Sequence, residues 1–236
     1  MTDTIVLLAA VRHEIAPCAA LLSLRRCGIR YTGCVDGRRI VAMISGVGET
    51  RAVRALEDVV GAERPARLVH LGFAGALNPA LRVGDVPEFS GVVDESGGRV
   101  GIGVEQPQAR PKVEATGDGP TLLTAQQLAD STAMKRKLFE RHGACAVDME
   151  TYAVARRAAE MALPLTVLRA ISDDADTVVP AAALSWVNAD GSIDAWAATR
   201  HLARRPWLVG PVMRLKQGCD RAAERLATRV AEMLAR

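Results

Sequence analysis

Aromatic residues are scarce in this chain of 236 residues, since three Phe, two Tyr and three Trp make up only 3% of it. A protein that stacks many nucleic-acid bases needs more flat rings than this. The formal net charge of +3 is also too small to indicate nucleic-acid binding by the whole chain. We therefore expect no nucleic-acid partner. Apolar residues reach 49%, which is enough for a sizeable core and excludes a disordered or fibrous chain.

Long hydrophobic runs are missing as well. The longest run near the N-terminus, from Ile5 to Val11, is far too short to span a bilayer and lacks the flanks of a secretory signal peptide. The five cysteines form no C-x-x-C pair, and the four histidines show no metal-ligand spacing. We expect a cytoplasmic protein with reduced thiols, no metal and no cofactor.

Short apolar runs of strand length alternate with helical stretches. Strands are predicted at 4–11, 39–45, 68–71, 144–147 and 163–171, with weaker candidates at 83–86, 91–93 and 99–104. Strands that are apolar throughout lie in sheets covered on both faces. We predict a single α/β domain over residues 1–236, with a central mixed β-sheet flanked by helices. A helical C-terminal extension should begin at about residue 183.

The connections between these strands are predicted from helical spacing and turn residues. One helix should follow residue 48 and stop near Gly61, and another should follow residue 147. Residues 72–76 have the composition of a small-residue turn, and 96–120 that of a long connection. The final forty residues should be helical, with breaks at Pro206 and Pro211.

Polar side chains directly follow several of the predicted strands. In parallel sheets, ligands bind outside the carboxyl ends of the strands. Three separate segments deliver carboxylates to this edge, and the convergence indicates a functional site. The polar residues concerned are Glu14, Ser45, Asp148, Glu150, Ser172 and Asp173.

Four blocks in this order resemble the nucleoside phosphorylase and nucleosidase superfamily. They are the first strand with Glu14, ISGVG at 44–48, LGFAGALNPALRVGDV at 71–86, and VDMETYAVA at 147–155 with RAISDDAD at 169–176. Within it, the chain is most similar to the methylthioadenosine/S-adenosylhomocysteine nucleosidases and to the hopanoid-associated enzyme that removes adenine from adenosylhopane. The segment 183–222 resembles the extension of the hopanoid-associated group and is expected to lack a counterpart in the other.

The resemblance implies that the chain cleaves the N-ribosidic bond of an adenine nucleoside, with adenosylhopane as the preferred substrate. Asp173, beside Ser172, would protonate N7 of the leaving adenine. Glu14 would position the attacking water. The remaining residues would bind substrate: Glu150 at the ribose hydroxyls, Met149 beneath the ribose, Leu128 at the adenine where the family has an aromatic ring, and Gly72, Phe73, Ser45 and Asp148 around them.

Water is favoured over phosphate as the nucleophile. A phosphorylase of this superfamily holds phosphate with arginines and a hydroxyl residue, and here His70 and Phe73 stand at two of those positions. A phosphate dianion normally needs at least two charged or bidentate partners. Arg12, Arg51 and Arg54 are the nearby candidates, so a phosphate-dependent purine nucleoside phosphorylase stays open.

Other interpretations of the same residues stay open too. An Asp after a strand can simply cap a helix, and acids favour the first turn of a helix in any protein. A methylthioadenosine/S-adenosylhomocysteine nucleosidase and a non-catalytic purine-nucleoside-binding protein are the alternatives. A dinucleotide-binding fingerprint is disfavoured because G-F-A-G lacks the third glycine.

Positive charge is concentrated in the C-terminal segment. Residues 199–236 hold nine Lys or Arg against three Asp or Glu. Leu226, Val230 and Met233 form an ordinary core stripe there, which favours a solvated helix packed on the domain. Arg200, Arg204 and Arg205 beside Trp207 instead suggest peripheral contact with the inner leaflet, which a lipid-linked adenine nucleoside would require. The resemblance also implies a homodimer.

Overall fold

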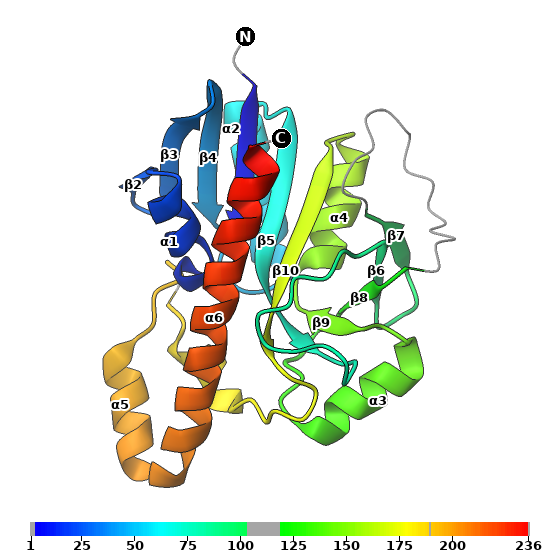
Figure 1. Ribbon diagram of the computed structural model, residues 1–236, viewed down its shortest axis with the longest axis vertical. Helices are drawn as coiled ribbons and strands as arrows, with labels where there is room; N and C mark the ends of the chain where they lie inside the picture. Colours follow the sequence, from blue (N-terminus) through cyan, green and yellow to red (C-terminus); the bar gives the residue numbers. More distant parts are fainter. Residues whose placement is uncertain (1–2, 103–118, 189, 236) are drawn as a thin grey trace.

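A mixed ten-stranded sheet forms the centre of the computed structural model, which describes residues 3–102, 119–188 and 190–235 (Figure 1). The strands follow the order β2-β3-β4-β1-β5-β9-β8-β6-β7, and β10 pairs with β5. Parallel pairing joins β1 to β4 and β5, and β5 to β10, whereas β3 pairs antiparallel with β4. The strands are β1 (Thr4–Ala9), β2 (Arg25–Cys27), β3 (Arg30–Val35), β4 (Arg38–Ile44), β5 (Arg67–Ala76), β6 (Gly91–Asp94), β7 (Arg99–Gly101), β8 (Thr121–Thr124), β9 (Ala146–Asp148) and β10 (Leu165–Asp173).

Helices cover both faces of this sheet. The helices α1 and α6 pack on one face through Ile15, Leu226 and Val230, and α2 and α4 pack on the other through Leu56 and Val154. Each fully buried side chain of this kind contributes roughly 1.5–3 kcal/mol. The predicted α/β architecture with a flanked mixed sheet is confirmed. The helices are α1 (Arg12–Leu21), α2 (Glu49–Glu63), α3 (Thr132–His142), α4 (Thr151–Glu160), α5 (Ala195–Arg204) and α6 (Val209–Leu234), with 3₁₀ turns η1 (Ala181–Trp186) and η2 (Pro206–Leu208).

Two predictions about strands were wrong. Residues 72–76 are not a turn, because β5 continues through them and pairs first with β10 and then with β9. Residues 83–86 are not a strand but a loop, in which the N–H of Val83 donates to the carboxylate of Asp174 at 2.8 Å. The strand expected at 99–104 is β7, and its last two residues lie outside the described residues.

The predicted helix boundaries also need correction. α2 continues past Gly61 to Glu63 and ends where Arg64 adopts a left-handed conformation with φ of 45°. α6 runs through Pro211, which stands in the first turn, where no intrahelical partner awaits its missing N–H. The break expected at Pro206 is present, between α5 and α6. No helix of the described ranges is long and apolar enough to cross a membrane.

Candidate active site

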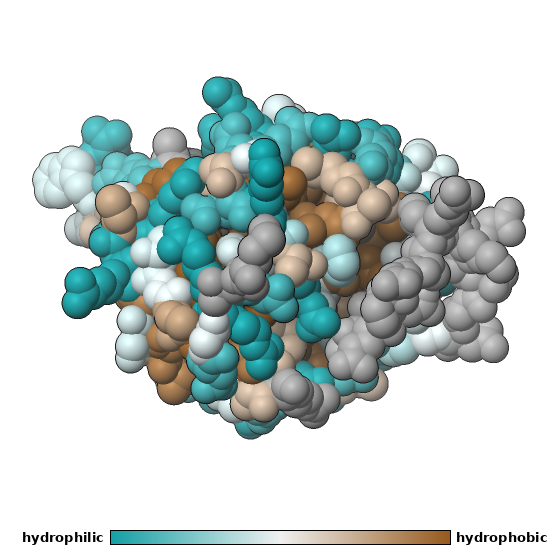
Figure 2. Space-filling view, turned by 90° about the horizontal axis from the view of Figure 1, so that it is seen from above, coloured by the Kyte–Doolittle hydropathy of each residue, from teal (hydrophilic) through white to brown (hydrophobic). Residues whose placement is uncertain are grey.

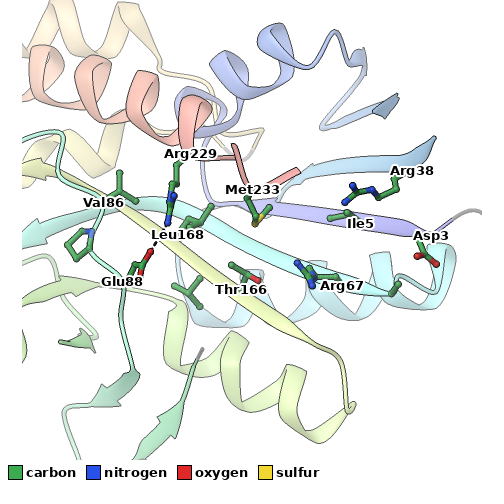
Figure 3. Close-up of a pocket in the computed structure, with 13 residues that line it drawn as sticks. Asp3, Ile5, Arg38, Arg67, Val86, Glu88, Thr166, Leu168, Arg229 and Met233 are labelled. Carbon is green, nitrogen blue, oxygen red and sulfur yellow. Dashed lines mark hydrogen bonds and ion pairs between the residues drawn. The ribbon is translucent and has the colours of Figure 1, made fainter. Parts of the chain in front are cut away.

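Two cavities lie at opposite ends of the parallel strands. The first, of about 310 Å³, opens at the amino ends of β1, β5 and β10, the end from which Figure 2 views the molecule. Figure 3 shows its lining, where Arg229 forms an ion pair with Glu88 at 2.6 Å and Met233 and Leu168 supply apolar surface. It contains none of the residues that the sequence predicted for the site, so the chemistry must be sought at the other end.

The second cavity, of about 250 Å³, opens at the carboxyl ends of the strands. Eight of the predicted site residues line it, from five separate segments of the chain. They are Glu14, Phe73, Leu128, Asp148, Met149, Glu150, Ser172 and Asp173. The structure therefore brings together acids that lie up to 159 positions apart in the sequence.

Ser45 and Gly72, which the sequence places among the substrate-binding residues, are not part of the lining of this cavity. The hydroxyl of Ser45 donates to the carbonyl of Ala9 at 3.2 Å and to that of Gly46 at 2.9 Å. Gly72 lies behind the wall, where an added Cβ would stand 2.1 Å from Nη1 of Arg169 and 2.7 Å from Oε1 of Glu14. The glycine is needed because two charged side chains approach the backbone of β5 at this point.

Glu14 is fixed by backbone donors from two segments. Its Oε2 accepts from the N–H groups of Ala10 and Val11 at 2.8 and 2.9 Å, which holds the carboxyl at the first turn of α1. Its Oε1 accepts from the N–H of Phe73 on β5 at 2.8 Å. Burial raises the pKa of Glu14, against the lowering effect of Arg169 and these donors. A carboxylate with a raised pKa suits the role of a general base.

Glu150 follows β9 at the start of α4 and faces the same cavity. Its Oε1 accepts from the N–H of Gly48 at 2.8 Å, and Gly48 can turn toward it because a glycine tolerates its φ of 102°. Burial, reinforced by the negative charge of Asp148, raises the pKa of Glu150 to about 7. This carboxyl therefore changes charge near neutral pH.

Asp173 reaches the cavity through an irregularity in β10. The register against β5 shifts between Ile171 and Asp173, which re-aims the end of the strand and places Asp173 opposite Gly75. Its Oδ1 accepts from the hydroxyl of Ser172 at 2.7 Å. Its Oδ2 accepts from Nζ of Lys135 at 2.5 Å, and the side chains of this ion pair are 1% and 9% exposed. Both oxygens are thus oriented by neighbours.

Asp148 lines the cavity, but its carboxylate oxygens belong to a buried network of hydrogen bonds and an ion pair. Its carboxylate forms an ion pair with Arg169 at 2.8 Å and accepts from the hydroxyl of Thr124 at 2.7 Å and from that of Thr151. The guanidinium also lies 3.1 Å from a ring nitrogen of His70, and burial lowers the pKa of His70 well below its usual range. Asp148 therefore balances Arg169, and its oxygens are engaged by protein donors.

Lys135 and Arg169 are the residues that sequence reasoning missed. Lys135 also donates to the carbonyls of Asp174 and Thr177, so its ammonium ties α3 to the loop that follows Asp173. The helix could have been found, because Ser131 caps its start and a left-handed Gly143 ends it. An arginine inside an otherwise apolar strand was the signal for the buried network.

Lysine and arginine are absent from the described lining of this cavity. Arg12 is paired with Asp190 at 2.7 Å, and Arg51 and Arg54 are exposed on α2. Nor do three or more His, Cys, Asp or Glu side chains form a group suited to a metal ion in the described part of the chain.

Comparison with known proteins gives a family match and several relatives. The model of the phosphorylase superfamily matches residues 4–203. The 5′-methylthioadenosine/S-adenosylhomocysteine nucleosidase of Staphylococcus aureus (strain JH9) is 26% identical over 164 residues, which cover 61% of this chain and 72% of that protein.

Solved structures share the fold. The 5′-methylthioadenosine/S-adenosylhomocysteine nucleosidase of Helicobacter pylori, crystallised with butyl-thio-DADMe-Immucillin-A, has a TM-score of 0.71 and 18% identity over 100% of this chain and 99% of its own. The futalosine hydrolase of the same organism has a TM-score of 0.71 and 17% identity, and the superposition covers 100% of this chain and 98% of that one. The first superposition covers the whole chain, the range 183–222 included.

Proposed function

The chain belongs to the phosphorylase superfamily, and from this membership and the cavity we propose that it is an enzyme that hydrolyses the N-ribosidic bond of an adenine nucleoside and releases adenine. The observation that carries the proposal is the meeting of three buried carboxyl groups, Glu14, Glu150 and Asp173, around one cavity. Cleavage of this bond requires a proton for the leaving base and stabilisation of the cationic sugar that develops. Carboxyl groups can meet both needs.

Asp173 is the general acid of the proposed mechanism. As the bond between C1′ and N9 breaks, its electron pair moves into the purine and the proton of Asp173 passes to N7. In the structure both oxygens of Asp173 accept hydrogen bonds, from Ser172 and Lys135, as those of a carboxylate do. Asp173 must therefore take up a proton from solvent before the bond breaks, and its two neighbours fix the orientation of the carboxyl. Water then attacks C1′ and gives up its proton to the carboxylate of Glu14, which three backbone donors keep in place.

Glu150 and Met149 bind the sugar. The free oxygen of Glu150 accepts hydrogen bonds from the ribose hydroxyls, and its negative charge favours the cationic transition state. Met149 supplies a soft apolar surface beneath the ribose. Leu128 and its neighbours on the loop after β8 form the wall against which the adenine lies.

Water is the proposed nucleophile, because the described lining has no lysine or arginine for a phosphate dianion. Arg169 lies close to Glu14, but it is paired with Asp148 and does not line the cavity. Glu14 and Glu150 would also repel an approaching dianion. A neutral water molecule meets no such barrier.

An apolar group is the proposed 5′ substituent of the nucleoside. One wall of the cavity comes from the loop after β10 and from the C-terminal segment, and it is apolar: Val179, Ala183, Val187, Ile193 and Leu215. This wall favours adenosylhopane as substrate, with peripheral membrane contact of a cytoplasmic enzyme. The name of the staphylococcal relative supports methylthioadenosine or S-adenosylhomocysteine as the second candidate. A homodimer is part of the proposal.

The test is to incubate the protein with adenosine, methylthioadenosine and adenosylhopane, with and without phosphate, and to measure free adenine. Phosphate-independent release, fastest with adenosylhopane, is the expected result. Release that requires phosphate would replace the hydrolase by a phosphorylase. Binding of all three without release would leave a non-catalytic nucleoside-binding protein.

A further inference from the structure

The helical segment 195–217, here called the projecting hairpin, is the least buried part of the structure. It comprises α5, η2 and the first turns of α6, and it extends below the sheet at the lower left of Figure 1. None of its residues is buried, and the first buried residue of α6 is Gly218. A segment with so little contact to the core keeps its side chains available for another surface.

Large apolar side chains are exposed along the projecting hairpin. Trp196 is 75% exposed, Trp207 is 68% exposed, and Val209 and Met213 are also exposed. These tryptophans are not needed to attach the hairpin, because Trp186, which is buried, packs edge-on against His201 of α5. Tryptophan favours the boundary between lipid and water, where its ring is buried and its N–H remains hydrated.

All the formal charge of the projecting hairpin is positive. Residues 195–217 contain no Asp or Glu and five Lys or Arg. Four of these five form no ion pair with any described residue: Arg200, Arg204, Arg205 and Arg214. Such a surface is complementary to a layer of anionic headgroups. It also disfavours a second copy as the partner, because two identical positive surfaces repel each other.

The projecting hairpin begins and ends at the active-site cavity. Ile193, two residues before α5, and Leu215, near its other end, both line the cavity wall. Ile193 is 53% exposed and Val178, beside the lining residue Val179, is 56% exposed, so the rim of the cavity is apolar as well. A bilayer that received the hairpin would therefore lie next to the cavity.

We propose that the projecting hairpin docks on an anionic lipid bilayer. Trp196 and Trp207 insert at the level of the headgroups, and the arginines contact the lipid phosphates. Docking turns the cavity toward the bilayer, so a nucleoside attached to a lipid can enter it without leaving the membrane. This entry route rests on the proposed function, whereas the docking itself does not.

Vesicle co-sedimentation of the full chain tests the docking. The protein should pellet with vesicles of phosphatidylcholine and phosphatidylglycerol and much less with phosphatidylcholine alone. The double variant Trp196→Ser/Trp207→Ser and the double variant Arg200→Gln/Arg204→Gln should each lower the affinity roughly tenfold or more. Substitution is preferable to truncation, because deletion of 204–236 would remove Leu226 and Val230 from the core.

The matched control is Arg54→Gln/Arg64→Gln, which removes the same charge from α2 and its C-terminus, away from the hairpin. Loss of binding in this control as large as in the hairpin variants would overturn the proposal, because net charge alone would then explain it. Full vesicle binding by both hairpin variants would overturn the proposal too. So would hairpin variants that change in oligomeric mass and still bind vesicles like the parent.

Adenine release from methylthioadenosine separates this proposal from the proposed function. The hairpin variants should release adenine at the parental rate, since none of the substituted residues lines the cavity. If no protein, parent included, releases adenine but vesicle binding follows the expected pattern, the docking stands and the nucleosidase fails. Adenine release by a parent protein that does not bind vesicles would support the nucleosidase and overturn the docking.

Discussion

Replacement of Glu150 by Gln should separate the role of this carboxyl in catalysis from its effect on stability. Burial and the charge of Asp148 raise the pKa of Glu150 from 4.5 to about 7. A carboxyl whose pKa is raised by folding stabilises the native state below its unfolded pKa, and this contribution is lost as the pH rises through the folded pKa. Since one pKa unit corresponds to about 1.4 kcal/mol, full ionisation costs roughly 3 kcal/mol.

The amide that Glu150→Gln introduces cannot ionise and can still accept from the N–H of Gly48, so the variant avoids this loss. The free energy of unfolding, measured by urea denaturation, should be similar for Glu150→Gln and parent at pH 5. Between pH 5 and pH 8 the variant should gain roughly 2 to 3 kcal/mol over the parent. Glu57→Gln, at an exposed position of α2, should show no such gain.

Adenine release should fall in the same variant by roughly 10²-fold or more, because the amide lacks the charge that stabilises the cationic sugar. The combination of higher stability at pH 8 and lost activity is the signature of a residue retained for function. The reasoning is refuted if the stability difference is the same at both pH values, or if the variant turns over like the parent.

Three further variants test other parts of the site. Asp173→Asn should slow adenine release about 10²- to 10⁴-fold, while calorimetry shows adenosine bound with nearly parental affinity; parental turnover would exclude Asp173 as the acid. Lys135→Met should lower the free energy of unfolding by about 3–5 kcal/mol, because it leaves a buried carboxylate unpaired. Adding Asp173→Asn to this variant should recover part of the loss, and no recovery would show that the ion pair is absent in solution. Gly72→Ala should lower both thermal stability and adenine release, because its Cβ would collide with Arg169. The matched variant Gly61→Ala, whose Cβ meets nothing within 4 Å, should be stabilised by about 0.5–1 kcal/mol, and equal effects of the two would contradict the packing argument.

The sequence indicated where the acids would gather because continuous apolar strands imply a covered sheet with its polar residues at the strand ends. Glu150 and Asp173 could be placed by that rule alone. α1 escaped prediction because its N-cap, Val11, offers no capping oxygen and Pro17 lies inside the helix. The backbone donors that hold Glu14 were therefore not foreseeable.

Residues 72–76 were misread for a different physical reason. Two glycines in five residues suggested a turn, yet Gly72 and Gly75 belong to β5 and lie where other side chains approach it. The reason for each glycine is thus a long-range contact, with Arg169 and Glu14 at one and Asp173 at the other. Likewise, 38 positions separate Lys135 from Asp173, and no local pattern encodes that pairing.

The choice of nucleophile follows from the positions and partners of the positively charged side chains near the site. Arg169 and Lys135 are both buried, and each balances one carboxylate, Asp148 and Asp173 respectively. His70 adds no charge, because burial keeps its pKa well below the usual range. The remaining carboxyls, Glu14 and Glu150, have raised pKa values and face the cavity without a lysine or arginine beside them on its described lining. Such a surface favours a cationic transition state and disfavours an anionic nucleophile. To accept phosphate, the cavity would need an arginine on its own wall. Arg169 does not line the cavity and is paired with Asp148, so water is the expected reactant.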